Sequence, residues 1–242
     1  MLRMIFYLTL CEFRLKYSGS VFGYFWHLIL PALGFGAVYW ASLQVFARPS
    51  SHSAASLLIG LLVWGYFRDA TVAALTSVTQ RGLLVKDLGI PPLQIIIATG
   101  FAPFLSLLLN LAIGIPICYF LFHSRPSLSI VALPLILLVL LILSESICVI
   151  LALACTRFRD LQFIWIGGLQ VFIWTLPVYY SYPSFLSFNP LATLIEGTQG
   201  AITGEGITSG AKNLLTLSMT CLLLLSAMSF SKKMSARISE GL

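Results

Sequence analysis

Charged side chains are scarce in this chain. Asp, Glu, Lys and Arg together make up 9% of the 242 residues, whereas hydrophobic residues make up 59%. Soluble globular domains contain about 25% charged residues. The composition therefore excludes an ordinary water-soluble domain and predicts a protein that crosses a membrane several times.

The sequence also lacks the common signatures of catalysis and nucleotide binding. It contains no GxxxxGK[ST], no GxSxG and no HExxH. A P-loop needs the adjacent Gly-Lys to hold phosphates, so this chain cannot bind ATP by a P-loop of its own. Active transport would need an ion gradient or an ATP-hydrolysing partner, and no inverted repeat of the kind found in gradient-driven transporters is evident.

Potential metal ligands are few and scattered. The five cysteines, at positions 11, 118, 148, 155 and 221, include no CxxC pair, and the three histidines do not cluster. We therefore expect no metal site and no cofactor on this chain, and we interpret the cysteines as small buried hydrophobic residues. A lipid-modifying membrane enzyme would need clustered acidic or histidine side chains, but the acidic ones fall at different depths.

Long apolar runs dominate what is present. A hydrocarbon core about 30 Å thick needs roughly 20 apolar residues per helix. The sequence contains six such runs, at residues 21–46, 56–78, 93–122, 128–155, 161–180 and 214–230. They predict an all-α integral membrane protein with six transmembrane helices, forming a single domain over residues 1–242.

The distribution of basic residues predicts the topology. The net charge is +6, but most Lys and Arg residues flank alternate ends of the six runs. Cytoplasmic segments carry the excess of Lys and Arg, so both termini are expected in the cytoplasm. The membrane topology explains the excess of Lys and Arg residues, which therefore does not indicate nucleic-acid binding.

Two segments on the predicted cytoplasmic side have amphipathic character. Residues 1–18 mix a short apolar run with Arg3, Glu12 and Lys16, which predicts a helix lying in the membrane interface with its charges toward the cytoplasm. Residues 81–92 combine charges with apolar side chains that would face the cytosol, and exposed apolar residues indicate a partner surface. For residues 1–18, a docking role and simple membrane anchoring both stay open. For residues 81–92, the alternative is a helix that lies on the membrane.

Ionisable residues occur inside two of the apolar runs. Arg68 and Asp69 lie in the second run and Glu145 in the fourth. Such residues usually face a partner, the bundle interior or water. We predict an interhelical pair between Arg68 and Glu145, which would be either a structural salt bridge or part of a polar pathway.

The segment from Arg157 to Gly204 is the most distinctive part of the sequence. It begins with a charged cluster of Arg157, Arg159 and Asp160, continues as an apolar helix and breaks at Pro177. Short amphiphilic pieces follow within residues 181–211. They predict short re-entrant helices on the outer side, and such backbone needs a covering of protein or a water-filled cavity.

The order of these features resembles the membrane subunit of ABC-2 type exporters, particularly the permeases that export O-antigen, capsule or teichoic-acid polysaccharide. The resemblance covers nearly the whole chain. It rests on residues 13–23 before the Trp26-containing run, 60–67, 84–92, 157–161, 176–180 and 189–196. One departure is the segment Gly89-Ile90-Pro91-Pro92, where related permeases often carry a charged residue before the proline.

The resemblance implies a bacterial inner-membrane homodimer that works with two ATP-binding subunits, which would hold ATP and Mg²⁺. Substrate would pass between the two copies. The implied ATPase-coupling residues are Arg14, Lys16, Leu83, Leu84, Lys86, Asp87, Leu88, Ile90 and Pro91. Candidates for the translocation path are Arg68, Glu145, Phe172, Trp174, Tyr179, Tyr180, Asn189 and Glu196.

Aromatic side chains favour a lipid-linked polysaccharide as the substrate. Sugar rings present CH faces that pack on aromatic rings. The candidate platforms are Trp165, Phe172, Trp174, Tyr179, Tyr180 and Tyr182. The alternative for these residues is an ordinary interfacial aromatic belt. The alternative function is export of a small amphiphile or drug, which would need a narrower and less aromatic path.

Overall fold

The computed structural model describes residues 2–15, 26–45, 54–82, 87, 89–124, 128–179, 189–204 and 210–241. All regular secondary structure within these ranges is helical. The α-helices are α1 (Leu2–Leu15), α2 (Trp26–Val45), α3 (Ala54–Gln80), α5 (Pro92–Phe120), α6 (Leu133–Cys155), α7 (Leu161–Phe172), α8 (Pro190–Thr203) and α9 (Gly210–Gly241). Two 3₁₀ helices, η2 (Leu128–Ala132) and η3 (Ile173–Thr175), adjoin α6 and α7.

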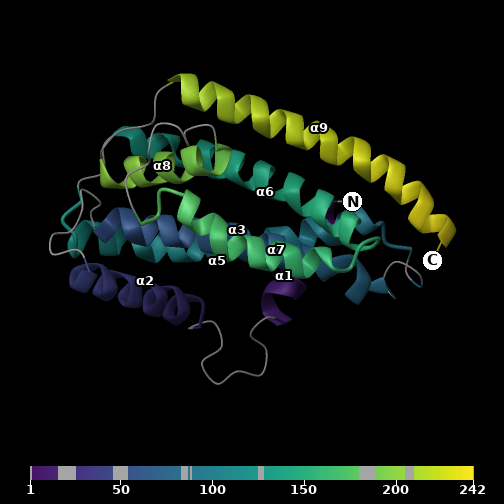
Figure 1. The fold of residues 1–242 in the computed structure, drawn as a ribbon, viewed down its shortest axis with the longest axis horizontal. Coiled ribbons are helices and arrows are strands. Elements are labelled where there is room, and N and C mark those ends of the chain that lie inside the picture. The colour runs from purple at the N-terminus through teal and green to yellow at the C-terminus, as the bar shows by residue number, and fades with distance from the viewer. Residues whose placement is uncertain are drawn as a thin grey trace.

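Helix α3 lies at the centre of the bundle. It packs against α5, α6 and α8, and also against α2 and α7. Figure 1 shows α2 and α9 along opposite edges of the bundle. Most of α3 is buried, including Ile59, Val63 and Ala70 with no exposed surface. The core of the protein is therefore built around one apolar helix.

Within the described ranges, four helices are long and apolar enough to cross a membrane. They cover Ala54–Gln80, Pro92–Phe120, Ser129–Cys155 and Lys212–Ser229. Two shorter apolar helices, Ile29–Ala41 and Leu161–Thr175, coincide with the first and fifth predicted runs. An all-helical membrane protein is confirmed, and six spans remain a prediction.

The fifth predicted run forms a shorter helix than its apolar length indicates. The helical part ends at Thr175 and Leu176 is extended, with φ −107° and ψ 152°. At 1.5 Å per residue, residues 161–175 extend about 22 Å. The predicted break at Pro177 is confirmed, because Leu176, Pro177 and Val178 leave the helix as a buried turn.

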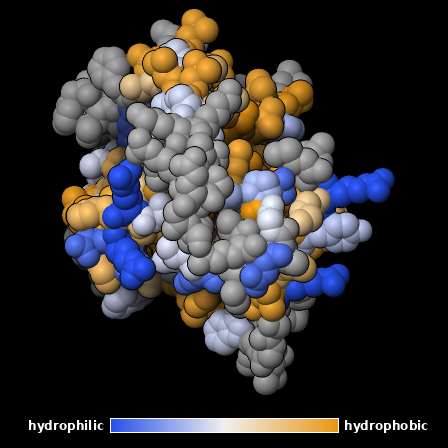
Figure 2. Space-filling view, turned by 90° about the vertical axis from the view of Figure 1, so that its right-hand side faces the viewer, coloured by the Kyte–Doolittle hydropathy of each residue, from blue (hydrophilic) through white to orange (hydrophobic). Residues whose placement is uncertain are grey.

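Both ends of the chain lie at one end of the bundle, on the right in Figure 1. Figure 2 looks onto this end and shows hydrophilic side chains among hydrophobic ones. The charged cluster of Arg157, Arg159 and Asp160 is exposed between α6 and α7. A shared side for both termini agrees with the arrangement that the basic residues predict.

Helix α8 is a short, deeply buried element at the other end of the bundle. Asn189 caps its start, where the side-chain oxygen accepts a hydrogen bond from the Leu191 amide at 3.0 Å. Gly204 ends it with φ 84°, a conformation that glycine adopts without steric cost. Helix α8 packs against α3, α6 and α9. A short helix after the fifth run is therefore present, and its re-entrant path in a membrane remains a prediction.

Gln199 connects α8 to two other segments through hydrogen bonds. Its side-chain nitrogen donates to the carbonyl oxygen of Ser56 at 2.9 Å and to that of Pro177 at 3.0 Å. Gly60 makes room for this amide, because a Cβ there would lie 2.7 Å from the Gln199 nitrogen. This single buried side chain thus connects the start of α3, the break after η3 and α8.

We predict that Gln199→Leu lowers the thermal unfolding midpoint of the purified protein. Loss of the amide removes two donors and leaves the buried Pro177 carbonyl without this donor, at a cost of about 1–3 kcal/mol. Gln170→Leu, at an exposed position on α7, is the control. Equal midpoints for the Gln199 variant and wild type would show that the hydrogen bonds of Gln199 do not stabilise the fold.

Candidate functional site

A half-open groove runs between α2, α3, α5 and the end of α7. Its cavity has a volume of about 440 Å³, within the usual range for small-ligand pockets. Aromatic rings and polar side chains share its walls. The lining includes Trp26, Phe35, Trp64, Tyr66, Arg68, Asp69, Ser106, Asn110, Gln170, Trp174 and Tyr179.

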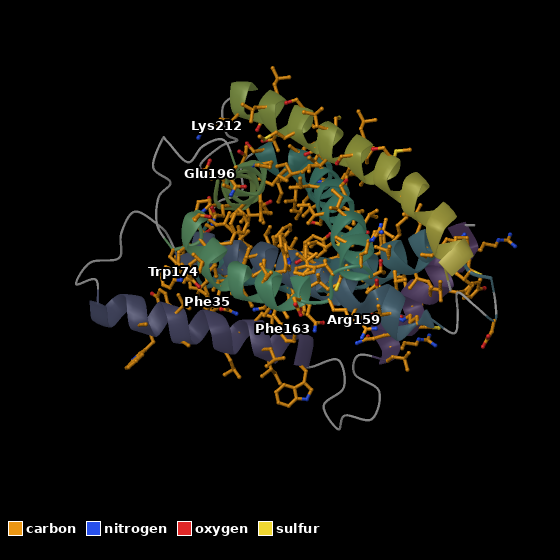
Figure 3. The ribbon with its side chains drawn as sticks, turned by 45° about the vertical axis from the view of Figure 1, so that its right-hand side comes forward. Phe35, Arg159, Phe163, Trp174, Glu196 and Lys212 are labelled. Atoms are coloured by element: carbon orange, nitrogen blue, oxygen red, sulfur yellow. The ribbon has the colours of Figure 1, made fainter. Side chains whose placement is uncertain are left out.

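Two aromatic contacts shape one side of the groove. Trp174 lies against Tyr179 with ring centroids 5.0 Å apart, and Trp64 lies against Phe172 at 6.0 Å. Trp174 is 62% exposed, and Figure 3 shows it near Phe35 of α2. Because α7 ends early, Trp174 lies at the end of its helix instead of deep within a span. This position gives the groove an open aromatic wall.

Arg68 and Asp69 form the charged part of the groove. Nε and Nη2 of Arg68 donate to Oδ1 of Asp69 at 3.1 and 2.9 Å. Their side chains are 50% and 38% exposed, so both can reach a molecule in the groove. The predicted pair between Arg68 and Glu145 is wrong, because Arg68 bonds to its sequence neighbour.

Glu145 does not line this groove. Its carboxyl group lies between α6 and α5, next to Gly100, and both oxygens are buried without a hydrogen-bond donor among the described residues. Exposed Arg68 and buried Glu145 therefore occupy different environments, which explains why they do not pair.

The other predicted path residues lie in different places. Phe172 packs partly buried against the core, Asn189 caps α8 and Glu196 lies 3.6 Å from Lys212 of α9 (Figure 3). Tyr180 lies outside the described residues. Their roles in transport remain predictions.

Two amide side chains that line the groove, Asn110 and Gln170, were not among the residues predicted for the translocation path. Each is an isolated polar residue in an apolar run, and this contrast was the available signal in the sequence.

A charged joint connects α1 to the end of α3 and to α5. Arg81 donates to the Glu12 carboxylate and, at 3.1 Å, to the Thr99 hydroxyl. Thr9 lies 3.4 Å from the Ala98 carbonyl oxygen and is 2% exposed. Glu12 therefore faces Arg81, and its direction toward the cytoplasm stays a prediction. Burial raises the pKa of Glu12, and the positive charge of Arg81 opposes that rise.

The coupling residues are only partly described. Arg14, Asp87 and Pro91 are exposed, and Pro91 precedes the first residue of α5. Ile90 is 4% exposed, so its predicted cytosol-facing position is wrong. The remaining coupling candidates, Lys16, Leu83, Leu84, Lys86 and Leu88, lie outside the described residues.

Two further expectations concern cysteines and metals. Cys118, Cys148 and Cys155 are buried as predicted, but Cys11 and Cys221 are exposed. In a membrane helix an apolar thiol can face lipid, so burial in protein is not required. Within the described ranges, no three His, Cys, Asp or Glu side chains come together as a potential metal site.

The family of ABC-2 type transporters matches residues 4–202 of this chain. This match includes nearly all of α1 and α8, the groove and the joint at Arg81. The chain belongs to the ABC-2 type transporter family.

Curated relatives share most of this length. An O-antigen export system permease protein RfbA of Myxococcus xanthus is 26% identical over 232 residues, covering 90% of this chain and 86% of the relative. A protein of the same name from Klebsiella pneumoniae is 25% identical over 193 residues, covering 76% and 74%. This ABC-2 chain is accordingly a membrane-embedded transport subunit and not an enzyme, and its family implies ATP-binding ABC subunits as partners.

We predict that Arg81→Ala destabilises this ABC-2 subunit. The change leaves the partly buried Glu12 carboxylate without this charged partner, and hydrogen bonds to charged groups contribute about 1.5–3 kcal/mol. Burial would then raise the pKa of Glu12 unopposed. Because the folded variant would bind a proton that the unfolded chain releases, its stability should fall as pH rises above the ordinary carboxyl range near 4.5.

The measurement is the unfolding midpoint of Arg81→Ala against pH, with Arg157→Ala as an exposed control. The exchange Glu12→Arg with Arg81→Glu should recover part of the lost stability. A midpoint that is unaffected by Arg81→Ala, or an exchange that is worse than both single changes, would contradict the joint.

Proposed function

We propose that this chain is the membrane subunit of an ATP-driven exporter that moves a lipid-linked polysaccharide across the bacterial inner membrane. Two copies form the conduit between them, and two ABC subunits in the cytoplasm hydrolyse ATP. The names of the relatives support an O-antigen-type substrate. The groove supports a polysaccharide on physical grounds.

The observation that carries the proposal is the composition of the groove. Trp174 and Tyr179 offer aromatic faces, and Asn110 and Gln170 offer amide donors and acceptors. Sugars need both surfaces, because their CH faces pack on rings while their hydroxyl groups donate and accept hydrogen bonds.

The charges of the groove fit the same substrate. Arg68 and Asp69 pair with each other, so their charges cancel and the pair presents polar atoms without a net charge. A transported chain must be held weakly enough to move on. Stacking and neutral hydrogen bonds meet that requirement better than a strong ionic contact.

Removing the polar and aromatic surfaces of the groove should reduce export. We expect Asn110→Leu with Gln170→Leu, and separately Trp174→Ala, to lower the amount of glycan on the cell surface about tenfold, the effect of ~1.4 kcal/mol in the rate-limiting barrier. Lipid-linked glycan should accumulate inside the cell. The measurement is surface glycan in a strain that carries only the variant gene.

Leu222→Ala is the matched control, because Leu222 is 66% exposed on α9 and does not line the groove. Each variant must still co-purify with its ATPase partner. Normal surface glycan in both groove variants would refute the polysaccharide assignment of the groove, and loss of a small amphiphile's export instead would favour that substrate.

The coupling segment has a separate test. Leu84→Asp with Leu88→Asp should prevent co-purification with the ATPase subunit while the chain still inserts, because burying two carboxylates in an apolar contact costs several kcal/mol. Ser51→Asp, in the connection expected on the opposite side, serves as the control. Intact co-purification of the double variant would refute docking at residues 81–92.

A further inference from the structure

A carboxyl group that does not line the groove lies buried in the wall of the subunit. Both oxygens of Glu145 are buried, and none of the described residues donates a hydrogen bond to them. A Cβ added to Gly100 of α5 would lie 2.5 Å from Oε1 and 2.8 Å from Oε2. The carboxyl group therefore fills the space that the missing side chain of Gly100 leaves between α5 and α6.

Other buried polar atoms surround this carboxyl group. Tyr66 of α3 is 4% exposed and lies within electrostatic range of Glu145, Ser144 and Cys148. The hydroxyl groups of Tyr66 and Ser144 are both buried and lie close to each other. Tyr66 and Cys148 are the titratable groups that face Glu145.

The contact between α5 and α6 at Gly100, here called the seam, has no positively charged residue on either helix. The sequences of α5 and α6 contain no Lys or Arg. The two arginines at α3 are engaged elsewhere, Arg68 with Asp69 and Arg81 with Glu12. On α9, which also packs against α6, Lys212 pairs with Glu196, and the other basic residues lie near the end of the helix at positions 232, 233 and 237. On α1, which packs against α5, Arg3 and Arg14 are exposed.

The depth of Glu145 makes an unpaired negative charge costly. Ten residues separate it from Cys155 and twelve from Leu133, the two ends of α6, so it lies about 15–18 Å along the helix from either end. A charged side chain at the centre of a bilayer costs at least about 2.5–3.5 kcal/mol. Neutralisation by a bound proton removes this cost.

We propose that Glu145 is a proton-binding site, a neutral carboxylic acid whose hydroxyl group is directed to the oxygens of Tyr66 or Ser144. Uptake of the proton forms one O–H bond on the carboxyl group, and its release to water leaves a carboxylate. The ionised form attracts water, which separates α5 from α6 at Gly100. This site acts on the packing of the subunit and does not depend on the identity of the transported substrate.

Close packing favours a proton over a metal cation as the ligand. The carboxyl oxygens lie against the backbone of α5 at Gly100, whereas a sodium ion would need space and several oxygen ligands at this position. A cation would also leave a carboxylate, and this difference can be measured directly.

Infrared spectroscopy of the full chain in lipid nanodiscs tests the proposal. At neutral pH, wild type should show the carbonyl band of a protonated carboxylic acid, and Glu145→Gln should lose one such group per chain. Glu196→Gln, which removes a carboxylate paired with Lys212, should leave that band unchanged. Loss of a carboxylate band in Glu145→Gln instead would show that Glu145 is ionised and would overturn the proposal.

Gly100→Ala provides a second variant if Glu145→Gln does not accumulate. Its methyl group would displace the carboxyl group, so the protonated-acid band should shift in frequency. An unshifted band would overturn the assignment to Glu145.

Thermal unfolding gives an independent readout. A folded chain that holds a proton loses stability as pH rises, so the wild-type midpoint should fall from mildly acidic to mildly alkaline pH, and Glu145→Gln should show a smaller fall. Equal falls in wild type and Glu145→Gln would overturn the proposed coupling between the proton and the seam. Sodium at constant pH should not change either midpoint, and sodium stabilisation of wild type alone would identify a cation site instead.

Discussion

The burial of α3 by the other helices is the constraint on which this structure depends. A helix enclosed on most sides places each polar residue along its length in a defined environment. At its start, the Ser56 carbonyl receives the Gln199 amide. Further along, Tyr66 faces the buried acid, Arg68 reaches the groove, and Arg81, directly after the helix, meets α1 and α5. One apolar element thereby connects the end of the subunit at α8, the groove and the end at α1.

This placement of the polar residues follows from the properties of lipid as the solvent of membrane-spanning helices. Lipid cannot hydrogen-bond to polar groups, so a polar side chain in a spanning helix must find a protein partner, reach a wet surface or lose its charge. The first two outcomes occur among the described residues, because Arg81 has a partner and the Arg68 and Asp69 pair lies in an open groove. The third is the outcome proposed for Glu145, whose carboxyl oxygens have no hydrogen-bond partner among the described residues.

Helix positions were largely predictable from the sequence, because long apolar runs report membrane helices directly. The second, third and fourth runs coincide with α3, α5 and the η2 and α6 segment. Pro177 marked the break in the fifth run, but the apolar run to residue 180 did not show that the helix already ends at Thr175. Burial of Leu176 and Val178 against neighbouring helices determines where the helix ends. The sequence of a single segment does not reveal such contacts.

Polar contacts between helices were less predictable. Opposite charges on two runs suggested a pair between Arg68 and Glu145, but the rotation of each helix decides which side chains meet. A nearer partner, Asp69, was available to Arg68 without any constraint on rotation. The joint between Glu12 and Arg81 joins residues far apart in sequence, and it could not be deduced from either amphipathic segment alone. The family resemblance supplied the class of protein, whereas these contacts required the structure.

The pairing of Arg68 with Asp69 has a consequence for the lipids around the subunit. A lone guanidinium in an open cleft would attract the phosphate groups of anionic lipids. The adjacent carboxylate cancels that attraction. Because the groove carries no net charge, it remains available to uncharged molecules when anionic lipids are present.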